Sequence, residues 1–275
     1  MTSKLRLLML SWLLMGVAVA QTGGVFTPGE FQTTNPYYLL PNPFYFEGRI
    51  DWNLLGISQP TNAWEYMERG IHYQDDLDDT QSAIADYETA LTFNSLQNNT
   101  CQIVTAATLV NGALPATLTP APCIFTLRLR LGYLEQQSNP TQAISLFQEV
   151  LKIDPLKLGV NTLIAETYVV EAQQTTDPTA QQQAYTNAIQ AYQAELALSP
   201  VTSVTIAFTG DQANNAHVHW ALAQIYQTLG QVSSAISELQ LYVQATQWHS
   251  DVYPWRIQLA NNLIKTLQSQ NHSGS

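Results

Sequence analysis

The chain has 275 residues and a formal net charge of −11 at pH 7, with 21 acidic and 10 basic side chains. This balance argues against nucleic-acid binding, which needs a basic face for the phosphates, and against anionic membrane surfaces. Charged residues make up 11% of the chain, against about 25% in an ordinary globular protein. Gln, Asn, Ser and Thr therefore supply most of the polar surface, either because it packs against a partner protein or because the source organism has this compositional bias.

Residues 1–20 are predicted to be a signal peptide that directs export and is then removed. Lys4 and Arg6 form a basic start, residues 7–20 are apolar, and Ala18 and Ala20 make a small-x-small cleavage site. The apolar run is shorter than the roughly 20 residues that a membrane-spanning helix needs. The sequence therefore predicts a periplasmic or extracellular protein without a membrane span.

Residues 21–60 form an amino-terminal arm that is rich in both proline and aromatic residues. Proline at this density excludes a helix and favours extended chain. Aromatic side chains gain too much from burial to remain in water, so the arm is expected to lie against a protein surface. It packs either on the first repeat of its own chain or on a neighbouring copy. The aromatic residues that would make these contacts are Phe26, Phe31, Tyr37, Tyr38, Phe44, Tyr45, Phe46 and Trp52.

A helical pattern recurs through residues 61–250. Each unit contains an Ala-Ile pair with an aromatic or leucine side chain three residues after the isoleucine, and the pairs begin at Ala83, Ala143, Ala188 and Ala235. This spacing places the apolar residues on one face of a helix. A second amphipathic segment precedes each pair, so the sequence predicts two helices per unit.

The pattern resembles the tetratricopeptide repeat (TPR) family, whose unit is a pair of helices of about 34 residues. The fourth unit carries the signature most completely, at Trp220, Ala223, Tyr226, Gly230, Ala235 and Leu239. In the first unit, Gly70 lies one residue away from the position that the TPR signature gives to its glycine. The resemblance implies an all-α solenoid of helical hairpins. Residues 251–275 are predicted to form a capping helix and a tail, which would cover the last apolar face.

Three insertions lengthen the units. Residues 95–124 are rich in β-branched side chains and contain Cys101 and Cys123, which are expected to form a disulfide in an oxidising compartment. That insertion is either a hairpin stapled at its base or an irregular disulfide-closed loop. The insertion at 199–212 also favours extended structure. The third, around residues 173–183, is compatible with helix on both sides of a proline and predicts two lengthened helices.

Several helix starts are predicted from capping chemistry. Asn62 with Glu65 matches a capping box, and Asn139 and Asp177 each precede a proline at the first helical turn. The acidic run at residues 75–79 lacks the central glycine and the terminal glutamate of a calcium loop, so helix capping is the favoured interpretation.

The resemblance also implies a concave face, lined by the first helix of each unit, that holds an extended segment of a partner. TPR domains that grip a terminal carboxylate place Lys and Asn at two positions of successive units. Here those positions hold Met67 and Ile71, Arg128 and Gly132, Thr162 and Glu166, and Trp220 and Gln224. The groove is therefore expected to be mixed apolar and aromatic, unless some of its residues belong to the core. Its candidate residues are Trp64, Met67, Ile71, Phe125, Arg128, Glu166, His217, Trp220 and Gln224.

No constellation of residues predicts an enzyme, a cofactor or a metal site, since there is no glycine-rich phosphate loop and no nucleophile elbow. His217 and His219 lie two apart on a predicted helix and point to different faces, so they cannot share a metal. Asn98 and Asn271 match the glycosylation sequon. The sequence thus predicts a non-catalytic scaffold. Its partners are either copies of itself, in a self-assembling structure, or another exported protein or peptide held in the groove of an adaptor.

Overall fold

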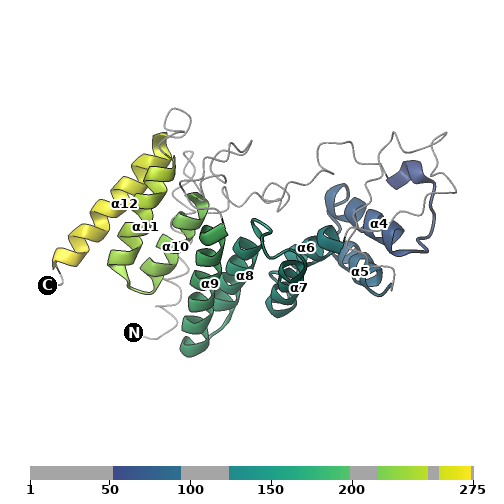
Figure 1. The fold of residues 1–275 in the computed structure, drawn as a ribbon, viewed down its shortest axis with the longest axis horizontal. Coiled ribbons are helices and arrows are strands. Elements are labelled where there is room, and N and C mark those ends of the chain that lie inside the picture. The colour runs from purple at the N-terminus through teal and green to yellow at the C-terminus, as the bar shows by residue number, and fades with distance from the viewer. Residues whose placement is uncertain (1–51, 94–123, 199–215, 247–253, 274–275) are drawn as a thin grey trace. The chain divides into compact units, whose positions relative to one another are not determined.

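The computed structural model describes residues 52–93, 124–198, 216–246 and 254–273 (Figure 1). Every regular element in these ranges is helical, which confirms the all-α prediction for this part of the chain. Contacts divide the chain into two compact units, and the boundary falls between Glu195 and Leu196. We describe the amino-terminal and carboxyl-terminal units separately. The predicted signal peptide, most of the arm, the Cys101–Cys123 disulfide and the two extended insertions lie outside the described residues.

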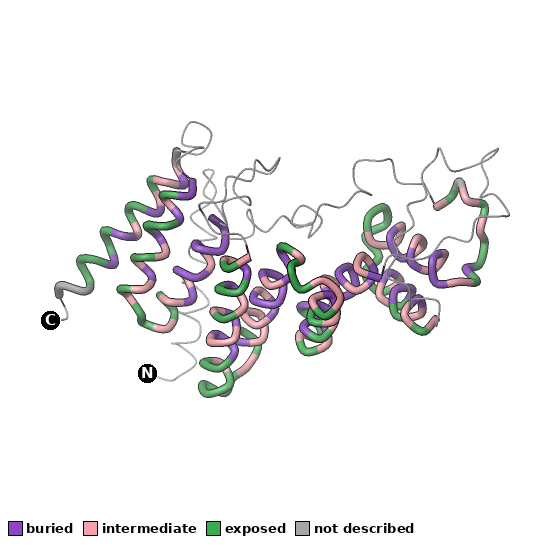
Figure 2. The backbone as a smooth tube through the Cα atoms, in the orientation of Figure 1, coloured by how far each residue is buried: buried purple, intermediate pink, exposed green. Residues whose placement is uncertain are grey.

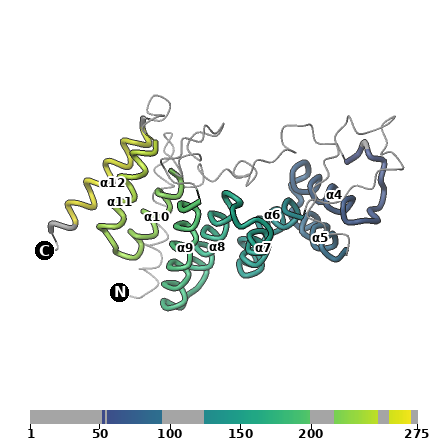
Figure 3. Tube along the Cα trace, viewed as in Figure 1, coloured from purple at the N-terminus to yellow at the C-terminus, as the bar shows by residue number. Residues whose placement is uncertain are grey.

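Helices of the amino-terminal unit follow one another as pairs joined by short turns (Figure 3). A short 3-10 helix, η2 (Trp52–Leu55), precedes the first pair and contacts its first helix. The three pairs are α4 (Ala63–Asp75) with α5 (Thr80–Leu91), α6 (Ile124–Glu135) with α7 (Pro140–Ile153), and α8 (Val160–Gln174) with α9 (Pro178–Leu198). The predicted lengthening of the third unit is confirmed in α9, which has 21 residues.

Side chains cap the amino termini of both helices of the first pair, and the sequence predicted part of this arrangement. The Asn62 side chain accepts from the Glu65 N–H at 3.0 Å, as in a capping box. The Glu65 carboxylate, however, accepts from the Thr61 N–H at 2.6 Å and not from Asn62. Asp79 caps α5 by accepting from the Ser82 N–H at 3.1 Å, which confirms the capping interpretation for that member of the acidic run.

Helix α8 begins without a side-chain cap of its own, because Gly159 precedes it in a left-handed conformation at φ 83°. The Glu195 carboxylate of α9 takes this role and accepts from the Gly159 N–H at 2.7 Å. Glu195 is 3% exposed, and its burial raises the pKa of the carboxyl against the opposing effect of the backbone N–H donors. A carboxylate at a helix amino terminus also interacts favourably with the helix dipole. This contact fixes α9 against α8.

Two apolar cores hold the amino-terminal unit together. Figure 2 marks the buried residues of its helices in purple. The first lies between α4, α5 and α6, and Leu55 and Ile57 from the end of the arm pack against it. The second lies between α6, α7 and α8. The last stretch of the arm thus packs on the first pair of its own chain, while the arm residues before Trp52 lie outside the described residues.

Two glycines allow the helices of the first two pairs to approach closely. A Cβ on Gly70 would lie 2.6 Å from Tyr87 Cε1, and a Cβ on Gly132 would lie 2.6 Å from Phe147 Cε1. Both rings are fully buried. Gly70 therefore occupies the same packing position as Gly132, although the sequence placed it out of register. Helix α4 continues further past its glycine than α6 does, so the offset is absorbed at the helix end.

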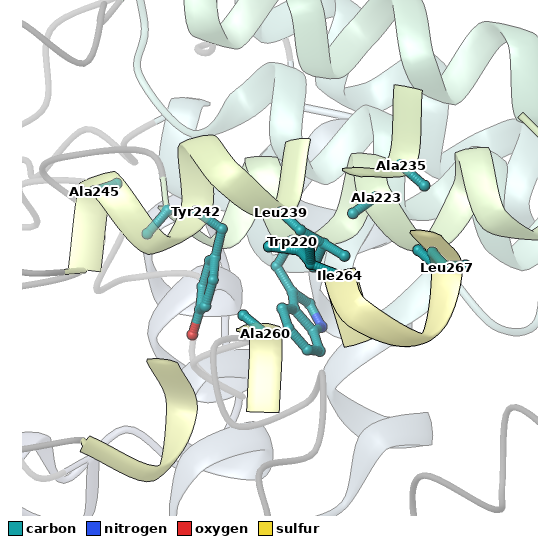
Figure 4. Close-up of a cluster of buried hydrophobic side chains, with 10 residues drawn as sticks. Trp220, Ala223, Ala235, Leu239, Tyr242, Ala245, Ala260, Ile264 and Leu267 are labelled. Carbon is teal, nitrogen blue, oxygen red and sulfur yellow. The ribbon is translucent and has the colours of Figure 1, made fainter. Parts of the chain in front are cut away.

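The carboxyl-terminal unit comprises α10 (Ala216–Thr228), α11 (Val232–Thr246) and α12 (Pro254–Ser273), which share one apolar core (Figure 4). The rings of Trp220 and Tyr242 lie 5.1 Å apart at its centre. Gly230, at φ 71°, ends α10 and lets the N–H of the next residue donate to the Tyr226 carbonyl at 2.8 Å.

Helix α12 covers the last pair, as predicted for a capping helix. Ala260, Ile264 and Leu267 face the core, whereas Asn261 and Asn262 are exposed. The outer face of α12 is therefore polar, which is what a terminal cap requires.

Candidate protein-binding face

The first helices of the three pairs in the amino-terminal unit, α4, α6 and α8, form a row. Arg130 of α6 donates from both terminal nitrogens to the Asp75 carboxylate at the end of α4, at 2.9 and 3.0 Å. At the end of α8, the Gln174 side chain donates to the Gln137 carbonyl just after α6, at 2.7 Å. The carboxyl ends of these helices, and the turns that follow them, therefore lie along one edge of the unit.

A buried polar network reinforces the joint between the first two pairs. Arg130 is 3% exposed and also donates to the Gln74 side chain at 2.9 Å. The Tyr87 hydroxyl of α5 donates to the same Gln74 oxygen at 2.8 Å. Burial raises the pKa of Tyr87, so its hydroxyl remains a donor across the physiological range. Three helices are thus linked through one buried guanidinium.

A second ion pair lies within the first pair of helices. Arg69 of α4 donates to both oxygens of Asp86 on α5, at 2.7 Å each. Its guanidinium also lies over the rings of Tyr66 and Tyr73, at 5.5 and 5.7 Å from their centroids. This cluster was not predicted from the sequence, although an arginine with two tyrosines at helical spacing, in a chain with so few charges, was a usable signal.

Three of the predicted groove residues lie half-buried on neighbouring helices, α6 and α8. Phe125 and Arg128 are three residues apart and share a face of α6. The Lys157 ammonium lies 5.8 Å from the centroid of the Phe125 ring, and Arg128 lies 3.9 Å from the Glu149 carboxylate. On α8, Glu166 adds to the effect of burial in raising the pKa of Tyr133 on α6. We call Phe125, Arg128 and Glu166 the α6–α8 face.

The remaining predicted groove residues are mostly inside the two units. Trp64, Met67 and Ile71 are 1%, 2% and 7% exposed and belong to the core between α4, α5 and α6. In the carboxyl-terminal unit, Trp220 is 4% exposed in the core and Gln224 is half-buried. These buried side chains support the first helices, and the residues beside them are only half-buried.

His217 and His219 are both buried in α10, although the sequence pattern placed His217 on the groove surface. The Nδ1 atom of His219 lies 2.7 Å from the Glu238 carboxylate of α11. Neither ring nitrogen of His217 has a hydrogen-bond partner among the described residues. Burial, with a smaller effect from His219, lowers the pKa of His217 to about 4.

Turns between helices carry the large apolar side chains that are most exposed in the described part of the chain. Leu77 lies in the α4–α5 turn and is 55% exposed, and Leu156 and Leu158 in the α7–α8 turn are 72% and 45% exposed. Helical periodicity in the sequence does not identify these leucines, because they lie between helices.

The described helices include none that is long and apolar enough to cross a membrane. Within the described ranges, His, Cys, Asp and Glu side chains also form no group of three or more that could hold a metal ion.

No protein-family model matches this chain, and no curated protein matches it either. A search of solved structures found a thermophilic TPR protein from Thermus thermophilus, with a TM-score of 0.42 and 15% sequence identity. The match covers 74% of this chain and 89% of that one. The assignment of helical hairpins therefore rests on the packing described above.

Proposed function

We propose that this chain is an exported, non-catalytic scaffold of TPR-type hairpins, and that its main partners are copies of itself. The observation that carries the proposal is the row formed by α4, α6 and α8. Buried cores and the Arg130–Asp75 pair hold these helices side by side, so they offer a preformed surface. A preformed surface binds a partner without the entropic cost of ordering itself.

Other parts of the chain pack on the first and last pairs of helices, and this packing restricts how copies could join. Residues 52–57 pack on the first pair, and α12 covers the last pair with a polar outer face. Stacking of bare repeats would need an open apolar face at one of these places. We therefore propose that copies meet through turns, through side faces, or through the arm before residue 52.

The exposed surface of α9 is polar but uncharged, and such a surface favours association between copies of an acidic chain. The outer face of α9 exposes Gln182, Gln183, Gln190 and Gln193. Two copies with a net charge of −11 repel one another, and the repulsion is weakest where the facing surfaces carry no charge.

The arm's part in assembly is tested with two forms of the protein, one lacking residues 1–20 and one lacking residues 1–51. The shorter form keeps η2 and the contacts of Leu55 and Ile57 with the first pair. Static light scattering should give a mass above that of a monomer for the longer form, and a lower mass for the shorter one. If both forms have the same mass, the arm does not bridge copies. If both are monomers, self-assembly is wrong.

The α6–α8 face favours a second function, that of an adaptor for a peptide of another exported protein. Its three residues are half-buried, so they combine a fixed position with access to a partner. The variant Phe125→Ala with Glu166→Ala should lose capture of exported proteins in a pull-down. Asn261→Ala on the outer face of α12 is the control. Equal capture by all three forms would exclude this face as the binding surface.

A further inference from the structure

We infer that the turn between α7 and α8, residues 154–159, is a docking surface for the acidic α4–α5 turn, residues 75–79, of a second copy of this chain. We call these two segments the leucine turn and the acidic turn. The inference rests on the proposed self-assembly and specifies the contact through which it occurs.

The leucine turn combines exposed apolar surface with positive charge. Leu156 and Leu158 are 72% and 45% exposed, and Lys157 stands between them. Two further cations, Arg128 and Lys152, both contact the carboxylate of Glu149, and Asp154 lies within the turn itself. Three cations therefore stand against two carboxylates at this surface. This excess of one positive charge, beside two exposed leucines on a chain with a net charge of −11, favours an acidic partner with an apolar side chain of its own.

The acidic turn offers the complementary chemistry. Leu77 is 55% exposed and lies among aspartates. Asp75 is neutralised by Arg130 at 2.9 Å, but Asp78 and Asp79 are exposed. The Ser82 N–H and hydroxyl lower the pKa of Asp79, which keeps that carboxyl ionised. One turn therefore presents a leucine with negative charge, and the other presents leucines with positive charge.

The two turns lie at opposite edges of the amino-terminal unit. The acidic turn follows α4, at the edge where the first helices end. The leucine turn precedes α8 and contacts Phe125 at the start of α6, so it lies at the edge where the first helices begin. The two turns of one molecule therefore cannot meet, and the complementary surface must come from another copy. A contact between unlike surfaces leaves one of each free at the ends and propagates into an open chain of copies.

Charge reversal on the chain lacking residues 1–20 tests this contact by sedimentation velocity. Lys157→Glu makes the leucine turn acidic, and Asp76→Lys makes the acidic turn less so. Asp76 is the C-cap residue of α4, where a cation interacts favourably with the helix dipole, and the substitution also removes the contact of its carboxylate with His72 Nδ1 at 2.7 Å. Each variant should raise the dissociation constant of self-association by at least about fivefold. Lys265→Glu on the exposed face of α12 is the control, because it changes the net charge as Lys157→Glu does.

Mixing the two variants gives the decisive result. In an equimolar mixture, the unaltered acidic turn of the Lys157→Glu variant meets the unaltered leucine turn of the Asp76→Lys variant, so the two proteins should form a mixed dimer with the wild-type affinity. The two altered turns are not complementary, so the mixture should not extend beyond that dimer. High salt should weaken self-association, because salt screens the exposed charges of the two turns. The screening length is about 8 Å at physiological ionic strength and shorter at higher salt. Circular dichroism confirms that each variant is folded. If the wild type associates but the variants and the mixture behave like the control, the contact is wrong and self-assembly stands. If the wild type is a monomer at every concentration, both are wrong.

Discussion

Gly70 and Gly132 show how single residues set the distance between paired helices. Each glycine faces a fully buried ring on the partner helix, Tyr87 or Phe147. Both glycines lie inside helices, where the residue is intrinsically unfavourable by about 1 kcal/mol relative to alanine. Their presence is therefore explained by close approach and not by helix formation.

Gly132→Ala is expected to destabilise the protein by about 1–3 kcal/mol, because the added methyl overpacks a buried site. The new Cβ would lie 2.6 Å from Phe147 Cε1, and the ring is fully buried. Urea denaturation followed by circular dichroism measures the change. Adding Phe147→Leu should recover part of the loss by making room. A Gly132→Ala variant as stable as the wild type would contradict the close approach.

Glu195 gives a pH-dependent test of the contact that starts α8. Its folded pKa is raised by burial, so the folded state holds the proton more tightly than the unfolded state does. The contribution of Glu195 to stability should therefore be largest below the unfolded pKa, about 4.3, and fall as the pH rises through the folded pKa.

Glu195→Gln should remove this pH dependence while keeping an acceptor for the Gly159 N–H. Glu195→Ala should cost about 1–3 kcal/mol, because that buried donor loses its partner. Thermal melts between pH 4 and 8 compare the three proteins, and equal slopes would contradict this role.

The sequence predicted which faces of the helices are apolar but not which of those residues a partner can reach. Trp64, Met67 and Trp220 fit the pattern of a groove and are buried in the cores. In an array of hairpins each first helix is packed against its own partner and against the next pair. Amphipathic periodicity gives the direction of the apolar face, but it does not say how much of that face the neighbouring pair covers.

At the scale of one element, α10 should make the carboxyl-terminal unit sensitive to acid. The folded pKa of His217 is about 4, lowered by burial and by His219, against about 6.5 in the unfolded chain. Between these values the unfolded state binds a proton that the folded state does not. The contribution of His217 to the free energy of unfolding is therefore fully present above the unfolded pKa. It is lost as the pH falls toward the folded pKa, and the loss reaches up to about 3 kcal/mol.

Hydrogen exchange at pH 7 and pH 5 measures this loss in α10. The titratable group that acts on His217 is His219 of the same helix, whose Nδ1 atom lies 2.7 Å from the Glu238 carboxylate of α11. Opening of α10 should become more frequent at pH 5, and His217→Leu should abolish most of the difference. An unchanged pH effect in that variant would assign the sensitivity to another group.

The positions where helices begin were the features of the fold most readily predicted from the sequence. Asn139, Asp79 and the Asp177-Pro178 pair act locally, and the structure places helices where they predict them. The Glu195 cap on α8 joins residues far apart in the sequence. The Arg130–Asp75 pair does the same between α6 and α4. No local pattern signals such pairs, so they emerge only once the helices are packed.

For the whole molecule, the structure changes where contacts between copies are expected. Residues 52–57 pack on the first pair and α12 covers the last pair, so we expect copies to meet through turns and side faces and not by stacking of bare repeats. Exposed leucines beside charges of opposite sign make the leucine turn and the acidic turn the described surfaces best suited to this role.

Sedimentation equilibrium of the chain lacking residues 1–20, over a wide range of concentration and at low and high salt, tests self-assembly most directly. We expect a mass that rises with concentration past that of a dimer, because contacts between unlike surfaces do not close. We also expect a lower mass at high salt, because exposed charges are screened. A constant monomer mass under all conditions would contradict the proposed self-assembly.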